Sequence, residues 1–306
     1  MQAPAKVLIL GAGGIGGLLA ARLSMGSHAH VYLGVRGATN KLAFMPEGRE
    51  GPALRPDVTT LHKPDTSTRY DWIIVATKAH DTSSLSEWLR HPSCANATVA
   101  MAQNGIDHAA RLSGVISPDR VVPLIVTYGA ERPTRGVFVQ TLDGVIQVPD
   151  SASGRSFAAL ADHAHLAVEI APDFDRALWT KLAWNLVSNS LTTLTNRSVR
   201  DVGRSPELRS VGVRLLGELR VAASLANVEI AASLETAMFP ILAAHAPSVR
   251  SSMWQDRRAG RRLEHEALSG AVARRLEATG RPAPYCRMIT DLLASLSNEA
   301  GDWSTA

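Results

Sequence analysis

Short apolar runs recur through the first half of the chain, separated by polar or helix-like stretches. The runs are KVLILG (6–11), HVYLGV (30–35), DWIIVATK (71–78), TVAMAQNG (98–105) and VVPLIVTYGA (121–130). Their apolar residues are continuous rather than alternating, which is typical of strands buried on both faces of a parallel sheet. The pattern therefore predicts a doubly wound α/β fold, with helices on both sides of a mainly parallel sheet.

The pattern changes twice beyond this region. Residues 136–149, GVFVQTLDGVIQVP, alternate in polarity on either side of Asp143-Gly144, which predicts an antiparallel hairpin. After a last apolar run at 165–173, helical periodicity replaces strand patterns almost completely. We expect two domains, residues 1–172 and an all-helical 173–306, with helices near 174 to the 190s, 205–227, 232–245, 251–258, 261–279 and 284–297.

Composition narrows the class of protein. With 306 residues, 45% apolar and 20% charged, the chain resembles an ordinary globular protein of two domains. The net charge of +4 is concentrated in arginine pairs with no interleaved aromatic residues, which argues against nucleic-acid binding and favours an anionic small molecule. The two cysteines have no metal-ligand or CxxC spacing, so we expect a reduced, cytoplasmic protein without a metal. The uncharged run 7–21 is too short to span a membrane.

A glycine-rich turn follows the first apolar run. Gly11, Gly13, Gly14, Ile15 and Gly16 belong to the sequence GAGGIG, which opens a predicted helix. In this setting the glycines permit a tight turn, close approach of the backbone to a pyrophosphate, and packing of helix on strand. A Rossmann-type dinucleotide site is the functional interpretation, and a structural turn is the alternative.

The residues beyond the motif favour NADP(H) over NAD(H). No acidic residue precedes Glu47, where an NAD site would place one to hold the ribose, and Arg36 stands there instead. Its guanidinium could bind the 2′-phosphate, with help from Lys41, unless Arg36 is a solvated loop residue. Lys78 and Asn104 follow two later strands and are further candidates for cofactor contacts.

The segment WTKLAWNLVSNSL (179–191) carries an unusual polar stripe. Lys181, Asn185, Ser188, Asn189 and Thr192 share one helix face, and residues 182–196 contain no charged side chain. A solvent-facing stripe would normally mix charges. The stripe therefore indicates either the lining of a binding cleft or a polar seam between helices, capped by a lysine that reaches solvent.

Taken together, GAGGIGG, TKA, QNG, WTKLAWNLVSN and SSMWQDRRAGRRLEHEALSGAV resemble the ketopantoate reductase (2-dehydropantoate 2-reductase) family over almost the whole chain. The resemblance implies an N-terminal Rossmann domain, a C-terminal helical domain, and reduction of ketopantoate to pantoate with NADPH in pantothenate biosynthesis. It implies that Lys181 is the general acid and that Glu264 binds the substrate hydroxyl. Asn104, Asn185, Asn189 and Ser252 correspond to substrate-binding residues, and Asn104 also lies near the nicotinamide.

The chain departs from the family pattern around Glu264. The family commonly has Thr-Glu-Ile-Asp, where this chain has Leu263-Glu264-His265-Glu266, and Ser269 replaces the asparagine before Gly270. Three hypotheses stay open: a ketopantoate reductase, a relative that reduces another carbonyl or imine, and an NADP(H)-binding sensor without turnover. For two of the single residues we weigh structural roles, with Ser252 as a helix cap and His265 as an exposed helical residue. The expected partner is a small-molecule substrate, with no nucleic acid and no membrane, and a homodimer is an open alternative.

Overall fold

The computed structural model describes residues 3–26, 28–37, 42–48 and 52–297. The chain divides into two compact units. The first consists of residues 1–103 and 107–174, and the second of residues 104–106 and 175–306. Within the described residues, none of the helices is both long enough and apolar enough to cross a membrane.

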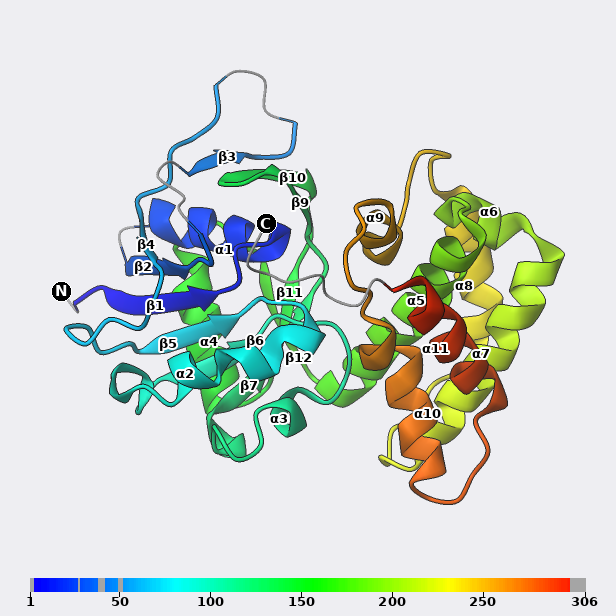
Figure 1. Ribbon diagram of the computed structural model, residues 1–306. Helices are drawn as coiled ribbons and strands as arrows, with labels where there is room; N and C mark the ends of the chain where they lie inside the picture. Colours follow the sequence, from blue (N-terminus) through cyan, green and yellow to red (C-terminus); the bar gives the residue numbers. More distant parts are fainter. Residues whose placement is uncertain (1–2, 27, 38–41, 49–51, 298–306) are drawn as a thin grey trace. The chain divides into compact units, whose positions relative to one another are not determined.

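A parallel sheet forms the centre of the first unit (Figure 1). Among the described residues it contains six strands in the order β4-β2-β1-β5-β6-β7, and every neighbouring pair is parallel. This is the strand order of a doubly wound dinucleotide-binding fold, so the predicted fold class is confirmed. The strands are β1 (Ala5–Leu10), β2 (Ala29–Gly34), β4 (Val58–Leu61), β5 (Trp72–Val75), β6 (Thr98–Met101) and β7 (Val121–Pro123).

Two small sheets complete the strand structure of this unit. One has the order β3-β10-β9 and the other β12-β11-β8. Helix α1 (Gly14–Met25) contacts strands of the parallel sheet and all three strands of the first small sheet, which explains why its residues 16–21 are all buried. The strands are β3 (Ala43–Met45), β8 (Ile125–Val126), β9 (Gly129–Thr134), β10 (Val137–Leu142), β11 (Ile146–Pro149) and β12 (Val168–Ala171).

The hairpin expected around Asp143-Gly144 is wrong. Strand β10 pairs with β9 and β3, whereas β11 pairs with β12 and β8. Gly144 instead lies against the backbone of Thr127 and Tyr128, where a side chain would collide. The dipeptide therefore leads the chain from one small sheet to the other, and its glycine is needed for close packing.

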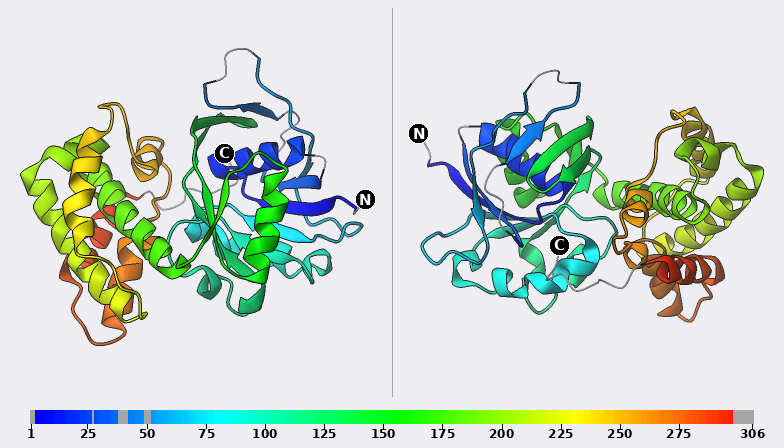
Figure 2. Two further views of the ribbon diagram at one scale, coloured as in Figure 1. Left: turned by 180° about the vertical axis from the view of Figure 1, so that it is seen from behind. Right: turned by 45° about the horizontal axis from the view of Figure 1, so that its top comes forward.

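Shorter helices connect the strands of the first unit. Helix α4 packs against β11 and β12, beside which it is drawn in Figure 2. The helices are α2 (Ser86–Leu89), α3 (His108–Arg111) and α4 (Ala152–Asp162), with 3₁₀ turns η1 (Ala79–Leu85), η2 (Pro92–Cys94) and η3 (Pro118–Arg120).

Among its described residues the second unit contains helices and loops but no strand, and it packs around the apolar residues of α5. Leu182, Leu186 and Leu191 of α5 lie in one core with Leu215 and Phe239. The helices are α5 (Phe174–Thr195), α6 (Val199–Arg204), α7 (Pro206–Ser224), α8 (Ser233–Ala244), α9 (Ser252–Arg258), α10 (Ser269–Glu277) and α11 (Pro284–Leu296), with the 3₁₀ turn η4 (His265–Ala267).

Two helix predictions need correction. Helix α6 was not expected, and the helix expected over 261–279 is regular from Ser269 to Glu277. Before it, Gly260 has a left-handed φ of 65°, and the chain then buries Leu263, Glu264 and His265 without forming an α-helix. The irregular segment brings the Glu264 carboxylate into the interior of the unit.

Candidate active site

The glycine-rich turn lies directly after β1 and leads into α1. Gly11 has a φ of 116°, which a side chain would make strained, and Gly13 is the N-cap residue of the helix. Gly13 has no side chain to cap the helix, so the N–H groups of the first turn have no capping side chain from this position. Ile15, in that first turn, is half-buried and packs against the apolar core of the unit.

The space around each glycine shows what each permits. A methyl group on Gly14 would collide with the carbonyl of Ala130, and one on Gly16 with the carbonyl of Gly11. At Gly13, by contrast, a methyl group would have no atom within 4 Å. Gly14 and Gly16 therefore allow α1 to pack closely, whereas Gly13 leaves open space at the helix N-terminus. A diphosphate would fit such a cradle.

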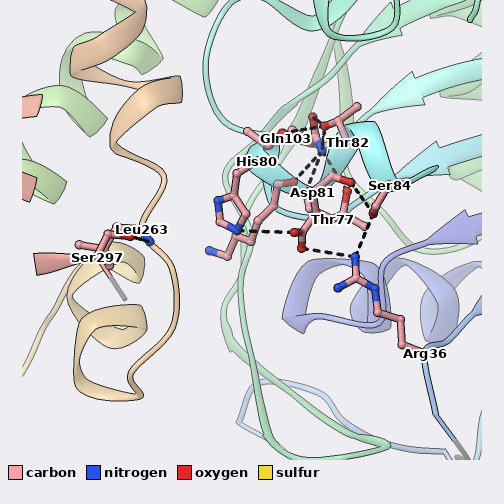
Figure 3. A network of polar contacts seen from close by, with 11 residues as sticks. Arg36, Thr77, His80, Asp81, Thr82, Ser84, Gln103, Leu263 and Ser297 are labelled. Carbon is pink, nitrogen blue, oxygen red and sulfur yellow. Dashed lines mark hydrogen bonds and ion pairs between the residues drawn. The ribbon is translucent and has the colours of Figure 1, made fainter. Parts of the chain in front are cut away.

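Arg36 lies just beyond the end of β2 and faces the segment after β5 (Figure 3). Its Nη2 donates to Ser84 Oγ at 3.1 Å and lies 3.6 Å from Asp81 Oδ2. The Arg36 side chain is still 46% exposed, so it can meet a ligand. Lys41, the suggested helper, lies outside the described residues.

Gln103 links the ends of β5 and β6 in the same network (Figure 3). Its Nε2 donates to the carbonyl of Thr77 at 2.9 Å and to that of Lys78 at 3.3 Å. His108 Nε2 bonds the Gln103 carbonyl at 2.9 Å, and burial lowers the pKa of His108 to about 4, so its neutral form donates this bond. The network fixes the backbone of Lys78, which is the N-cap residue of η1. No sequence pattern indicated this role of His108.

In the second unit, α5 carries the predicted catalytic stripe. Lys181 and Asn185 are half-buried and Asn189 is buried, at successive turns of the helix. Burial lowers the pKa of Lys181. A lysine with a lowered pKa releases its proton more readily than an exposed one.

Hydrogen bonds join three of the predicted residues. Asn185 Nδ2 donates to Asn104 Oδ1 at 3.1 Å, and Asn104 Nδ2 donates to Glu264 Oε2 at 3.2 Å. Glu264 is 6% exposed. Asn104 belongs to the helical unit although its neighbours in the chain, up to Gln103, belong to the first. The Glu264 carboxylate and the two amides thus form one hydrogen-bonded group in the second unit, and Asn185 lies on α5, the helix that carries Lys181.

The far end of the stripe has a structural role. Thr192 Oγ1 lies 2.6 Å from Ser251 Oγ, and Ser251 caps α9 by accepting from Trp254 N. This end is the polar seam between helices that was the alternative interpretation of the stripe. The adjacent Ser252 is exposed in the first turn of α9 and is not the cap, and no hydrogen bond joins it to Glu264 or Asn104 among those described.

His265 differs from expectation. It was expected to be exposed, but it is 7% exposed and lies in η4 beside Glu264. Burial lowers its pKa, and its Nδ1 has no hydrogen-bond partner among the described residues. The charged residues near His265 in the sequence are typical of an exposed segment, so the sequence pattern did not predict its burial. Within the described part of the chain, no cluster of three or more His, Cys, Asp or Glu residues is arranged to hold a metal.

Comparison with known proteins identifies the family. Residues 7–153 match the family model described as ketopantoate reductase PanE/ApbA, and residues 173–297 match its C-terminal model. A 2-dehydropantoate 2-reductase of Caulobacter vibrioides is 31% identical over 291 residues, which cover 94% of this chain and 98% of that protein.

Solved structures show the same fold. A PanE/ApbA family ketopantoate reductase from Ralstonia eutropha has a TM-score of 0.84 at 25% identity, covering 95% of this chain and 98% of that one. A D-mandelate dehydrogenase solved with NADH and anilino(oxo)acetate has a TM-score of 0.81 at 17% identity, covering 95% and 97%. The latter shares the fold alone. On the strength of the family models and the Caulobacter relative, this chain belongs to the ketopantoate reductase family of oxidoreductases.

Proposed function

We propose that the protein reduces ketopantoate to pantoate with NADPH, with Lys181 as the general acid. The observation that carries this proposal is the hydrogen-bonded series Asn185–Asn104–Glu264. Half-buried Lys181 lies on the same helix as Asn185, one turn before it. The hydrogen-bonded series joins residues from three distant parts of the sequence, and each of them was expected to meet the substrate.

The proposed cofactor-binding residues are residues of the first unit together with Asn104. The open space at Gly13 and the N-terminus of α1 fit a diphosphate, and Arg36 fits the 2′-phosphate that distinguishes NADPH from NADH. Lys78 and Asn104, each following a strand of the parallel sheet, would contact the ribose and nicotinamide portions. When bound, the nicotinamide supplies the hydride.

Lys181 would complete the reaction at the substrate oxygen. Hydride addition to a ketone leaves negative charge on its oxygen, and an ammonium group can donate a hydrogen bond and then a proton to it. The lowered pKa of Lys181 favours this transfer. Asn185 and Asn189 carry no charge, so they can orient the keto acid without competing for the ammonium group. Glu264, already a hydrogen-bond acceptor, would bind the substrate hydroxyl.

Steady-state kinetics tests the proposal. NADPH consumption would be followed by absorbance with ketopantoate, with a panel of other 2-keto acids, and with NADH in place of NADPH. We expect ketopantoate and NADPH to give the highest kcat/KM of all combinations. Tight NADPH binding with no turnover of ketopantoate would refute ketopantoate as the substrate, but it would support NADPH as the cofactor.

A second candidate is reduction of a different keto acid, carbonyl or imine by the same residues. The observation that favours it is buried His265 next to Glu264, at a position where the family commonly has isoleucine. A polar ring there changes the surroundings of the group proposed to hold the substrate hydroxyl. Under this candidate, His265→Ile raises kcat/KM for ketopantoate while it lowers kcat/KM for the preferred substrate.

A further inference from the structure

A second arginine lies beside the loop that carries Arg36. Arg135 belongs to the tight turn between β9 and β10, where Gly136 has a φ of 80°. Its guanidinium lies against Gly37, so closely that a methyl group there would stand 3.0 Å from Cζ and 3.1 Å from Nη2. Gly37 follows Arg36 directly, so Arg135, from a distant part of the sequence, lies against the residue next to Arg36 just beyond the end of β2.

The charges of Arg36 and Asp81 bear on how strongly Arg36 alone would attract a phosphate. Asp81, 3.6 Å from Arg36 and 15% exposed, offsets part of the charge of that guanidinium. A phosphate monoester carries a charge of about −1.5 to −2 at neutral pH. Arg36 and Asp81 together are close to neutral, so they would attract such a group weakly. Arg135 brings a second guanidinium to the residue next to Arg36.

We propose that Arg135 binds the 2′-phosphate of NADPH together with Arg36 and is a determinant of the preference for NADPH over NADH. The inference rests on the proposed function, which takes NADPH as the cofactor. Arginine suits this role because its planar fork of N–H groups can donate two hydrogen bonds to one phosphate.

Arg132, three residues earlier, supplies an internal comparison. Its Nη1 donates to the carbonyl of Ala12 at 3.1 Å, inside the glycine-rich turn. That turn would hold the diphosphate, which NADPH and NADH have in common. A change at Arg132 should therefore affect both dinucleotides alike, whereas a change at Arg135 should affect the one with the 2′-phosphate.

Equilibrium binding tests the proposal without turnover. Dissociation constants would be measured by calorimetry for NADPH and NADH, and for the fragments adenosine 2′,5′-bisphosphate and AMP. We expect Arg135→Ala to weaken NADPH and the bisphosphate about tenfold and to leave NADH and AMP unchanged. Arg135→Lys should recover part of the loss. Arg155→Ala, which removes an exposed arginine from α4 of the same unit, is the matched control for net charge and should change nothing.

The outcomes separate this inference from the proposed function. If the unmodified protein prefers NADPH and Arg135→Ala keeps that preference, the role of Arg135 is refuted and the cofactor assignment survives. An equal loss for NADPH and NADH would also refute it, because the effect would not depend on the 2′-phosphate. If the unmodified protein shows no preference, both proposals fail.

Discussion

The chemistry proposed for this protein depends first on the surroundings of Lys181. The side chain is half-buried, and burial holds its pKa below the ordinary value of 10.5. We predict that Lys181→Ala lowers kcat by about 10²–10⁴-fold, because the variant has no proton donor for the reduced oxygen. NADPH affinity should be unchanged in a direct binding measurement. Lys63→Ala, at an exposed lysine of the first unit, should match the unmodified protein in both assays.

The same residue sets a pH dependence. A general acid must be protonated, so kcat/KM for reduction should fall as pH rises through the pKa of Lys181. Since burial lowers this pKa, the fall should begin at lower pH than an exposed lysine would give. Lys181→Arg, which stays protonated, should lose the high-pH decline even if its rate is low. A profile that is the same in both proteins would exclude Lys181 as the titrating group.

We predict that the stability of the protein depends on the amide group of Asn104. It accepts from Asn185 and donates to the buried Glu264, so Asn104→Asp would place two carboxylates against each other. We expect the free energy of unfolding at neutral pH to drop by about 1–3 kcal/mol, and the deficit to shrink in acid as one carboxylate is protonated. Asn104→Asp with Glu264→Gln reverses donor and acceptor and should recover most of the stability. No recovery would show that the Asn104–Glu264 bond is not the cause.

At this scale the sequence predicts positions within an element better than pairs between elements. The helical period places Lys181, Asn185 and Asn189 on one face without further information. Asn104 and Glu264 are separated by 160 residues, and no local pattern indicates their hydrogen bond. Residue identities carried over from the family resemblance supplied both as candidates. The burial of His265 was missed because its flanking residues, Arg261, Arg262 and Glu266, are charged and exposed.

Among the elements, apolar runs predicted the buried strands well and the connections badly. Strands β1, β5 and β6 were found because a strand covered on both faces is apolar throughout. Strand β4, VTTL, was missed because it is short and half polar at the edge of the sheet. The Asp143-Gly144 hairpin was wrong because alternation identifies a strand but not its partner.

The glycine-rich turn gives a prediction about helix α1. Gly13→Ala places a methyl group in open space, so thermal stability should be nearly unchanged while affinity for both dinucleotides falls about tenfold or more. Gly14→Ala pushes α1 away from the Ala130 carbonyl in β9 and should lower the free energy of unfolding by about 1–3 kcal/mol. Calorimetry of the two variants measures their stability and their affinity for the dinucleotides. Equal stability losses would contradict the different roles assigned to these neighbours.

For the molecule as a whole, the two units should respond to different ligands. At a hundred times its Kd, NADPH should stabilise the protein by about 2.7 kcal/mol. Hydrogen exchange should show the added protection in β1, α1 and the end of β2. A keto acid alone should protect α5 and the segment around Glu264 instead. Protection by NADPH confined to the helical unit would contradict the assignment of the glycine-rich turn.

The three residues 104–106 have a consequence for the modularity of the enzyme. They belong to the helical unit, and Ile106 packs against its core, although the chain enters and leaves them from the first unit. The helical unit is therefore not encoded by one continuous stretch. A chimera joined near residue 174 would combine one parent's Asn104 and Ile106 with the other parent's Asn185 and Glu264. Exchange of domains between relatives should succeed when this tripeptide travels with the helical half, which thermal unfolding of the two kinds of chimera would show.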